Sequence, residues 1–282
     1  MEFEKVGSAQ IALLVIGTLL FLIIPPVIAI IWTKKKKEKF TTVLVGAATF
    51  LLFAIILEKP LQNILVFPVQ MGLPEHAAAK FISARPVLWA LILGLFPGVF
   101  EETGRLVAFK TILKKRKNRE TGVSHGIGHG GFEVMFALGI NYIMYIVYAS
   151  MINAGTFGDL VTQLDAQAPG QAEAGYTIAA QLASFSAGDL LLDITERIFA
   201  FMYHTGASML VFYACKDKKK FWLYPLAILI HTVIDAMAGL QLAGVISLSP
   251  LMQEAIVAVS GSAVFFGAYF LLYKKDRGNG QA

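Results

Sequence analysis

The sequence predicts an all-α protein, a polytopic membrane helix bundle with about seven transmembrane helices. The 282 residues are 56% hydrophobic and only 15% charged, with a mean hydropathy of +0.65. An ordinary soluble domain carries roughly 25% charged residues, so this chain lacks the polar surface that water would require. Apolar runs long enough to span a bilayer, about 20 residues each, recur along the whole chain. Short basic runs follow four of them.

Seven apolar runs give the expected spans, at 8–32, 41–58, 86–113, 124–152, 188–215, 221–243 and 250–273. We expect each to be a helix, because lipid offers no hydrogen-bond partner to the backbone and the alternating pattern of a barrel is absent. The first span is expected to stay as a helix that kinks or ends near Pro25-Pro26. Its acidic flank and its length, beyond the roughly 7–15 apolar residues of a signal peptide, argue against cleavage. Loop 153–187 is expected to hold a short interfacial helix near 176–187.

The basic residues predict the topology. Seventeen of the 24 Lys and Arg lie in four runs, Lys34–Lys39, Lys114–Arg119, Lys216–Lys220 and Lys274–Arg277. With the N-terminus outside and the C-terminus inside, all four runs are cytoplasmic, as expected for a multi-pass protein of the cell membrane. The net charge of +5 is thereby explained by basic runs that set the orientation of the chain in the lipid bilayer, and we expect no nucleic-acid partner. The single Cys215 excludes an intrachain disulfide and a cysteine metal cluster.

Ionisable residues within the spans are costly in lipid, so they mark candidate functional positions. The third span contains Glu101, Glu102 and Arg105. Glu101 and Arg105 are four residues apart and share a helix face, which allows an ion pair. Glu102 points about 100° away and is expected to lack a local partner. Two adjacent carboxylates in a low-dielectric setting do not both ionise easily, which suits one of them to act as a general base.

The fourth span has His125, His129 and Glu133 at intervals of four residues, so they line one helix face. Such spacing is compatible with zinc, although the H-E-x-x-H arrangement is absent because Gly126 takes the Glu position. His125 is expected to be an interfacial residue. The glycines around His129 favour close approach of another helix.

The fifth span carries a polar stripe of Asp193, Arg197 and the deeper His204, with the aspartate expected to be solvated or paired with Arg197. The sixth span has His231 and Asp235 four residues apart, a spacing that allows a His–Asp hydrogen bond. At 1.5 Å per residue, Glu102, Glu133, His204 and His231 all lie at one level, about 15 Å from the cytoplasmic ends of their helices. Spans one, two and seven show no comparable residue and are expected to pack or to face lipid.

In combination these motifs resemble the YhfC-type membrane peptidases, related to the CAAX-processing (Abi) and PrsW-type glutamate-dependent intramembrane proteases. The resemblance runs from the third span to the last. It implies that Glu101 and Glu102 are the paired catalytic glutamates, with Arg105 as their basic partner. It also makes His204, His231 and Asp235 motif residues. The roles of His129 and Glu133 follow less directly, because the Phe-x-x-x-His motif is missing and residue 136 is Phe.

The resemblance implies an intramembrane endopeptidase acting on a membrane-anchored peptide or protein. We expect a single integral membrane domain, 1–282, with its catalytic core at about 86–243. Glu101 or Glu102 would be the general base for a water held with His204 or His231, and a histidine or Arg105 would stabilise the oxyanion. No cofactor is expected. The alternatives are a zinc metalloprotease liganded by a Glu with His129, His204 and His231, a proton- or ion-coupled transporter, and a non-catalytic scaffold; the oligomeric state is left open.

Overall fold

The computed structural model describes residues 3–167 and 171–276, and in these ranges every regular element is a helix. Seven helical segments of this described part are long and apolar enough to cross a membrane. They are Ser8–Lys36, Phe40–Val66, Pro86–Lys110, Glu120–Ala154, Ala187–Lys216, Lys218–Leu242 and Pro250–Tyr273. The prediction of an all-α membrane bundle with seven spans is therefore confirmed.

Three of these spans are single α-helices, and the others combine several elements. The longer helices are α1 (Ser8–Lys36), α2 (Phe40–Phe50), α5 (Pro86–Lys110), α6 (Glu120–Val134), α7 (Asn141–Ala154), α8 (Phe157–Gln167), α9 (Gln171–Ser184), α10 (Ala187–Lys216), α11 (Leu223–Leu242) and α12 (Pro250–Ala268). The short helices are α3 (Lys59–Val66), α4 (Ala77–Ser83) and the 3₁₀ turns η2 (Val69–Met71) and η4 (Lys218–Lys220). Three π-helical segments, η1 (Leu51–Glu58), η3 (Met135–Ile140) and η5 (Tyr269–Tyr273), lie inside spans two, four and seven.

Some boundaries differ from the sequence prediction. Helix α1 continues across Pro25 and Pro26 to Lys36, so the expected end at the prolines is wrong. The second span does not end at Glu58 but continues through α3 to Val66. The loop after the fourth span holds two helices, α8 and α9, rather than one short helix. In the first two cases an apolar or amphipathic segment continues the helix past a residue that reads as a terminator.

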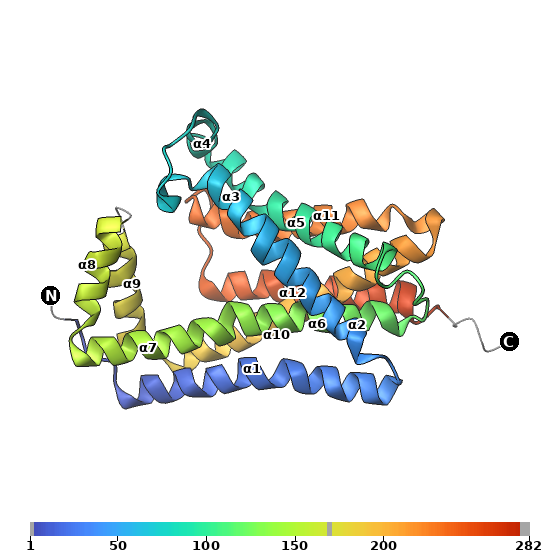
Figure 1. Cartoon of the computed structure of the whole chain (residues 1–282), viewed down its shortest axis with the longest axis horizontal. Helices are drawn as coiled ribbons and strands as arrows, with labels where there is room; N and C mark the ends of the chain where they lie inside the picture. The colour runs from blue at the N-terminus through green and yellow to red at the C-terminus, as the bar shows by residue number, and fades with distance from the viewer. Residues whose placement is uncertain (1–2, 168–170, 277–282) are drawn as a thin grey trace.

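The four basic runs gather at one end of the bundle. Figure 1 shows the α1–α2, α5–α6 and α10–α11 connections at the right-hand end, where the last span also finishes. Helices α8 and α9 lie at the opposite end, beside the start of α1. Arg277 of the fourth run lies outside the described residues. The segregation of charge along the bundle axis agrees with the positive-inside pattern.

Helix α10 forms the centre of the bundle. Its segment from Tyr203 to Ala214 is buried, and it packs against α5, α6, α11 and α12. Helix α5 packs along α11, and α2 packs along α6. The α2–α6 crossing requires a glycine, because a Cβ at Gly128 would collide with the backbone of Val43. These close crossings bring the polar faces of α5, α6, α10 and α11 together in the interior.

Candidate active site

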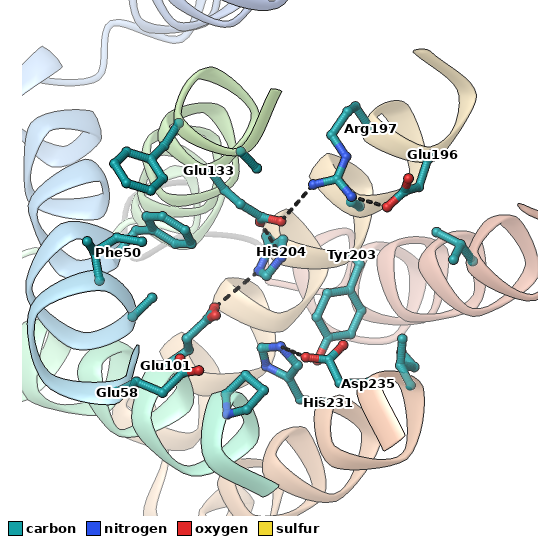
Figure 2. Close-up of a pocket in the computed structure, with 18 of the residues that line it drawn as sticks. Phe50, Glu58, Glu101, Glu133, Glu196, Arg197, Tyr203, His204, His231 and Asp235 are labelled. Atoms are coloured by element: carbon teal, nitrogen blue, oxygen red, sulfur yellow. Dashed lines mark hydrogen bonds and ion pairs between the residues drawn. The ribbon is translucent and has the colours of Figure 1, made fainter. Parts of the chain in front are cut away.

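A cavity of about 380 Å³ lies among η1, α5, α6, α10, α11 and α12. It is lined by many polar side chains for a site within membrane spans (Figure 2): Glu58, Lys59, Glu101, Glu133, Asn141, Glu196, Arg197, Tyr203, His204, His231, Asp235 and Ser260. Lys59, Asn141 and Glu196 belong to the halves of their spans that lie away from the basic runs. The cavity therefore leads from the deep histidines toward the end of the bundle that carries α8 and α9.

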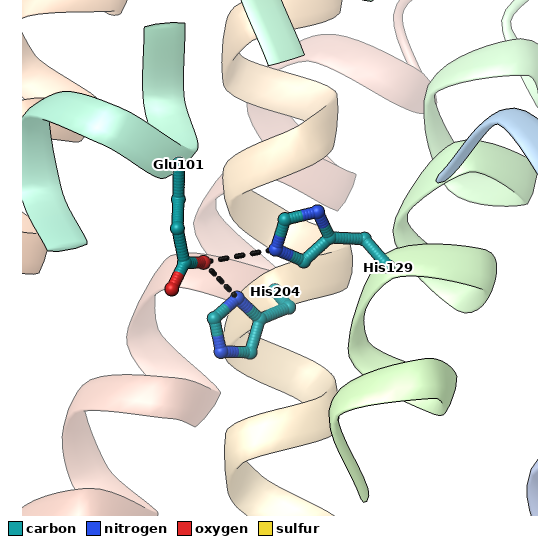
Figure 3. Close-up of side chains that lie close together, drawn as sticks. All are labelled: Glu101, His129 and His204. Carbon is teal, nitrogen blue, oxygen red and sulfur yellow. Dashed lines mark hydrogen bonds and ion pairs between the residues drawn. The ribbon is translucent and has the colours of Figure 1, made fainter. Parts of the chain in front are cut away.

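Three side chains from three different spans converge in the bundle interior, and two of them, Glu101 and His204, line this cavity. Glu101 of α5, His129 of α6 and His204 of α10 each offer one donor atom, and these atoms lie within 4.8 Å of one another. His129 Nε2 is 2.9 Å from Glu101 Oε2, and His204 Nδ1 is 3.7 Å from the same oxygen. Figure 3 shows both rings directed at the Glu101 carboxylate. Tertiary packing produces this convergence, because His129 and His204 are 75 residues apart in sequence.

Glu133 holds the His204 ring from its far side. Its Oε2 lies 2.5 Å from His204 Nε2, while Arg197 Nη1 donates to its Oε1 at 3.1 Å. A carboxylate accepts hydrogen bonds, so this contact places the imidazole proton on Nε2 and leaves the Nδ1 lone pair facing Glu101. A carboxylate that orients a histidine in this way is the usual outer partner of a metal-binding imidazole.

Arg105 lies behind the cluster and is fully buried. Its Nη1 donates to Glu102 Oε1 at 2.7 Å, and its Nη2 lies 2.7 Å from His204 Nδ1 and 3.5 Å from Glu101 Oε2. Its Nε donates to Ser208 Oγ at 3.2 Å. The expectation that Glu102 lacks a local partner is wrong, because the i,i+3 geometry brings Arg105 to it as well as to Glu101. Glu102 does not line the cavity.

His231 connects this buried layer to the cavity. Its Nδ1 is 2.9 Å from Glu102 Oε1, and its Nε2 is 3.6 Å from Asp235 Oδ2, the i,i+4 neighbour expected from the sequence. The Tyr203 ring lies with its centroid 5.1 Å from both His204 and His231. Its hydroxyl is buried and has no hydrogen-bond partner among the described residues. Glu102, Glu133, His204 and His231 thus belong to one connected group.

His125, expected at the membrane interface, is fully buried inside the protein, 3.2 Å from Ser208 Oγ and 3.3 Å from Thr49 Oγ1. The fourth span begins at Glu120, so His125 lies more than a turn inside it. The expected Asp193–Arg197 pair is replaced by Arg197 pairs with Glu133 and Glu196. Asp193 instead accepts the hydroxyl of Tyr142.

Glu58 is the principal cavity residue that the sequence analysis missed, since span two was expected to be featureless. It is only 1% exposed and faces the same cavity as Glu101. Its position before Lys59-Pro60 marks it as a span end in the sequence, whereas the helix continues for two more turns. Tyr203, which directly precedes His204 in the chain, is a second cavity residue that the sequence did not single out. The sequence signal that could have identified Glu58 is a carboxylate placed directly at the end of an apolar run.

Glu101, His129 and His204 form a donor set suited to a divalent metal. Two imidazoles and one carboxylate are the protein ligands of many catalytic zinc sites. Tetrahedral zinc at about 2.0–2.1 Å from each ligand separates its donor atoms by roughly 3.3 Å, and two of the separations here are 2.9 and 3.7 Å. The Glu133–His204 contact supplies the orienting partner. The residues present therefore fit a metal.

Comparisons with known proteins identify the family of the chain. Residues 19–257 match the model of the family described as "YhfC intramembrane metalloprotease". The chain is also 30% identical over 223 residues to the "Uncharacterized membrane protein YhfC" of Bacillus subtilis (strain 168), covering 79% of this chain and 81% of that protein. No solved structure matches the chain. The chain is a multi-pass membrane protein and belongs to the YhfC family of intramembrane proteases.

Proposed function

We propose that the protein is an intramembrane endopeptidase that holds a divalent metal, with zinc the first choice, on Glu101, His129 and His204. One observation carries this proposal: donor atoms from three separate spans meet within 4.8 Å of one another, and two of the three residues, Glu101 and His204, line a polar cavity. The family description supports a metalloprotease. The sequence expectation of no cofactor has no support from this donor set or from the family description.

Each residue around the cavity has a part in this proposal. A bound divalent cation supplies Lewis-acid chemistry for hydrolysis. Glu133 keeps His204 in the tautomer and orientation that present Nδ1 to the site. Tyr203 lines the cavity as an O–H donor. His231, whose Nδ1 donates to Glu102, would donate from Nε2 as an imidazolium, and these hydrogen bonds would stabilise the oxyanion of a peptide carbonyl under attack. Glu102 and Arg105 position His231 and Glu101 from behind.

The substrate class follows from where the cavity lies. The reacting groups are buried inside the spans, and the cavity continues toward the end of the bundle that carries α8 and α9. A peptide bond held at or within the membrane reaches these groups, whereas a folded soluble protein does not enter a cavity of about 380 Å³. We therefore propose a membrane-anchored peptide or protein as the substrate.

A second candidate mechanism has one specific observation in its favour. The Arg105 guanidinium contacts both His204 Nδ1 and Glu101 Oε2, two of the three metal donors. In the corresponding metal-free route, Glu101 acts as the general base on the hydrolytic water and Arg105 supplies the positive charge. This is the glutamate-type peptidase that the sequence pattern suggested.

Metal analysis of the full chain in lipid nanodiscs decides between the two mechanisms. Zinc measured by mass spectrometry should approach one ion per chain for the wild type, and should fall well below that for Glu101→Gln, His129→Ala and His204→Ala. His76→Ala is the matched control, since His76 lies outside the spans and caps α4. Cleavage of internally quenched single-span peptides should be lost with o-phenanthroline and return with zinc.

The opposite result is equally informative. Full cleavage with far less than one metal ion per chain, unaffected by o-phenanthroline, would replace the metal mechanism with the Glu101 general-base mechanism. A wild-type protein that cleaves none of the peptides, with or without added zinc, would contradict the peptidase proposal itself.

A further inference from the structure

Glu58 is a buried carboxylate without a hydrogen bond. It ends the π-helical segment η1 in the middle of the second span and is 1% exposed. Neither of its oxygens has a hydrogen-bond partner among the described residues. Its one ion pair, with Lys59 at 3.3 Å, involves a lysine side chain that is 54% exposed. Such a group is costly in a membrane interior, and an unsatisfied buried polar atom calls for a ligand or a role.

The other acidic side chains around the cavity are already engaged. Glu101 contacts His129, and Glu133 contacts His204 and Arg197. Glu196 pairs with Arg197, and Asp235 lies 3.6 Å from His231. A carboxylate that holds a buried cation or orients an imidazole is not free to exchange a proton. Glu58 has neither task, because its one cationic neighbour, Lys59, is 54% exposed.

The position of Glu58 suits a reaction at Glu101. Both residues line the same cavity. The charge of Glu58 interacts with the charge of Glu101 and with that of His231, which also lines the cavity. Figure 2 shows Glu58 and Glu101 on neighbouring helices, with His204 and His231 on the other side of the space. A π-helical segment inside an α-helical span is often found at a functional site, because it redirects the residues it carries. Here the redirected residue is Glu58.

Resting on the proposed peptidase function, we propose that Glu58 is the proton-transfer carboxylate of the hydrolysis. A water oxygen forms a bond to the peptide carbonyl carbon, and one water proton moves to the Glu58 carboxylate. The peptide C–N bond then breaks, and Glu58 returns that proton to the departing amine nitrogen. The second water proton stays with the new carboxylic acid group. Atoms and charge balance without any oxidant, reductant or further reactant.

The test compares Glu58→Gln with a matched variant in nanodiscs. Glu75→Gln removes an exposed carboxylate outside the spans. With the internally quenched single-span peptides as probe, Glu58→Gln should lower kcat at least about 10²-fold with little change in KM. Its zinc content and its thermal midpoint should stay at or above wild-type values, because the amide removes a buried charge whose one ion-pair partner, Lys59, is largely exposed.

Chemical rescue gives a second measurement that a structural role would not produce. In Glu58→Ala, the space left by the side chain admits formate, and added formate should restore cleavage several-fold. The same formate should not restore Glu133→Ala, whose carboxylate acts by orienting His204. If Glu58→Gln proves too unstable to purify, Glu58→Asp provides the same comparison, since it keeps the carboxylate but shortens its reach.

Several outcomes would overturn the inference. Near-normal cleavage by Glu58→Gln removes Glu58 from proton transfer. Loss of zinc in Glu58→Gln makes Glu58 a ligand rather than a proton carrier. Loss of cleavage matched by a large fall in thermal midpoint, without formate rescue, assigns it to the fold. These failures differ from failure of the proposed function, in which the wild type itself cleaves nothing and both proposals fall together.

Discussion

Glu133 Oε2 lies 2.5 Å from His204 Nε2, and this contact links helix α6 to helix α10 at the edge of the cavity. The other Glu133 oxygen accepts from Arg197, so the carboxylate is held from two sides. Because a guanidinium can only donate, the contact of Arg105 Nη2 with His204 Nδ1 makes Nδ1 an acceptor and places the ring proton on Nε2, toward Glu133. One side chain therefore decides the chemical character of another that lies 71 positions later in the chain.

Glu133→Gln should weaken metal binding without removing a ligand. The amide can present its N–H₂ group to His204 and so favour the wrong tautomer. Loss of an orienting partner typically costs about 10- to 100-fold in metal affinity or activity. Zinc competition with a fluorescent chelator measures the change, and Glu196→Gln, which keeps the Glu133–His204 contact, is the control. Unchanged affinity in Glu133→Gln would show that His204 needs no orienting carboxylate.

Tyr203→Phe tests the oxyanion role of the phenol. The substitution removes only the hydroxyl, which has no hydrogen-bond partner among the described residues. It keeps the ring between His204 and His231. We expect kcat to fall about 10²-fold, the effect of removing one oxyanion donor, with KM and thermal midpoint near wild type. Tyr176→Phe, in α9, serves as the control. A normal kcat in Tyr203→Phe would leave His231 as the donor to examine.

Gly128→Ala should destabilise the α2–α6 crossing. The added methyl group would overlap the backbone of Val43, which cannot move aside as a flexible side chain can. We expect the thermal midpoint in detergent to fall by several degrees, by analogy with overpacking of well-packed interiors. Gly267→Ala is the matched control, because its Cβ would meet no atom within 4 Å. Equal midpoints for the two variants would mean that the helices do not cross as closely as described.

The orientation of the bundle can be tested with single cysteines. In a Cys215→Ser background, cysteines at 37, 117 and 218 should resist an impermeant thiol reagent applied to intact cells. A cysteine at 165, in α8 at the opposite end, should react. The reason is the concentration of Lys and Arg at one end of the spans. Labelling at 37, 117 and 218 but not at 165 would invert the topology, and a split among the three would contradict the seven-span arrangement.

The sequence alone was sufficient for the architecture and for the identity of most polar groups. Seven spans could be predicted because hydropathy over about 20 residues is a property of local composition. The Glu101–Arg105 and His231–Asp235 pairs could be predicted because they depend only on the helical repeat. The resemblance to the YhfC family rested on the same residues, and the family match confirms it.

The composition of the cavity was decided by the tertiary structure. Glu58 reads as the end of a span until helix α3 continues beyond it, and His125 reads as interfacial until α2 and α10 cover it. From the sequence alone, Glu133 could have paired with any cation at its depth. The orientation of α10 about its axis places both His204 and Arg197 next to Glu133. The depth of a residue along its helix can be predicted from the local sequence. Which face meets which neighbour depends on packing between helices distant in the chain, and that packing placed Glu101, His129 and His204 around one point.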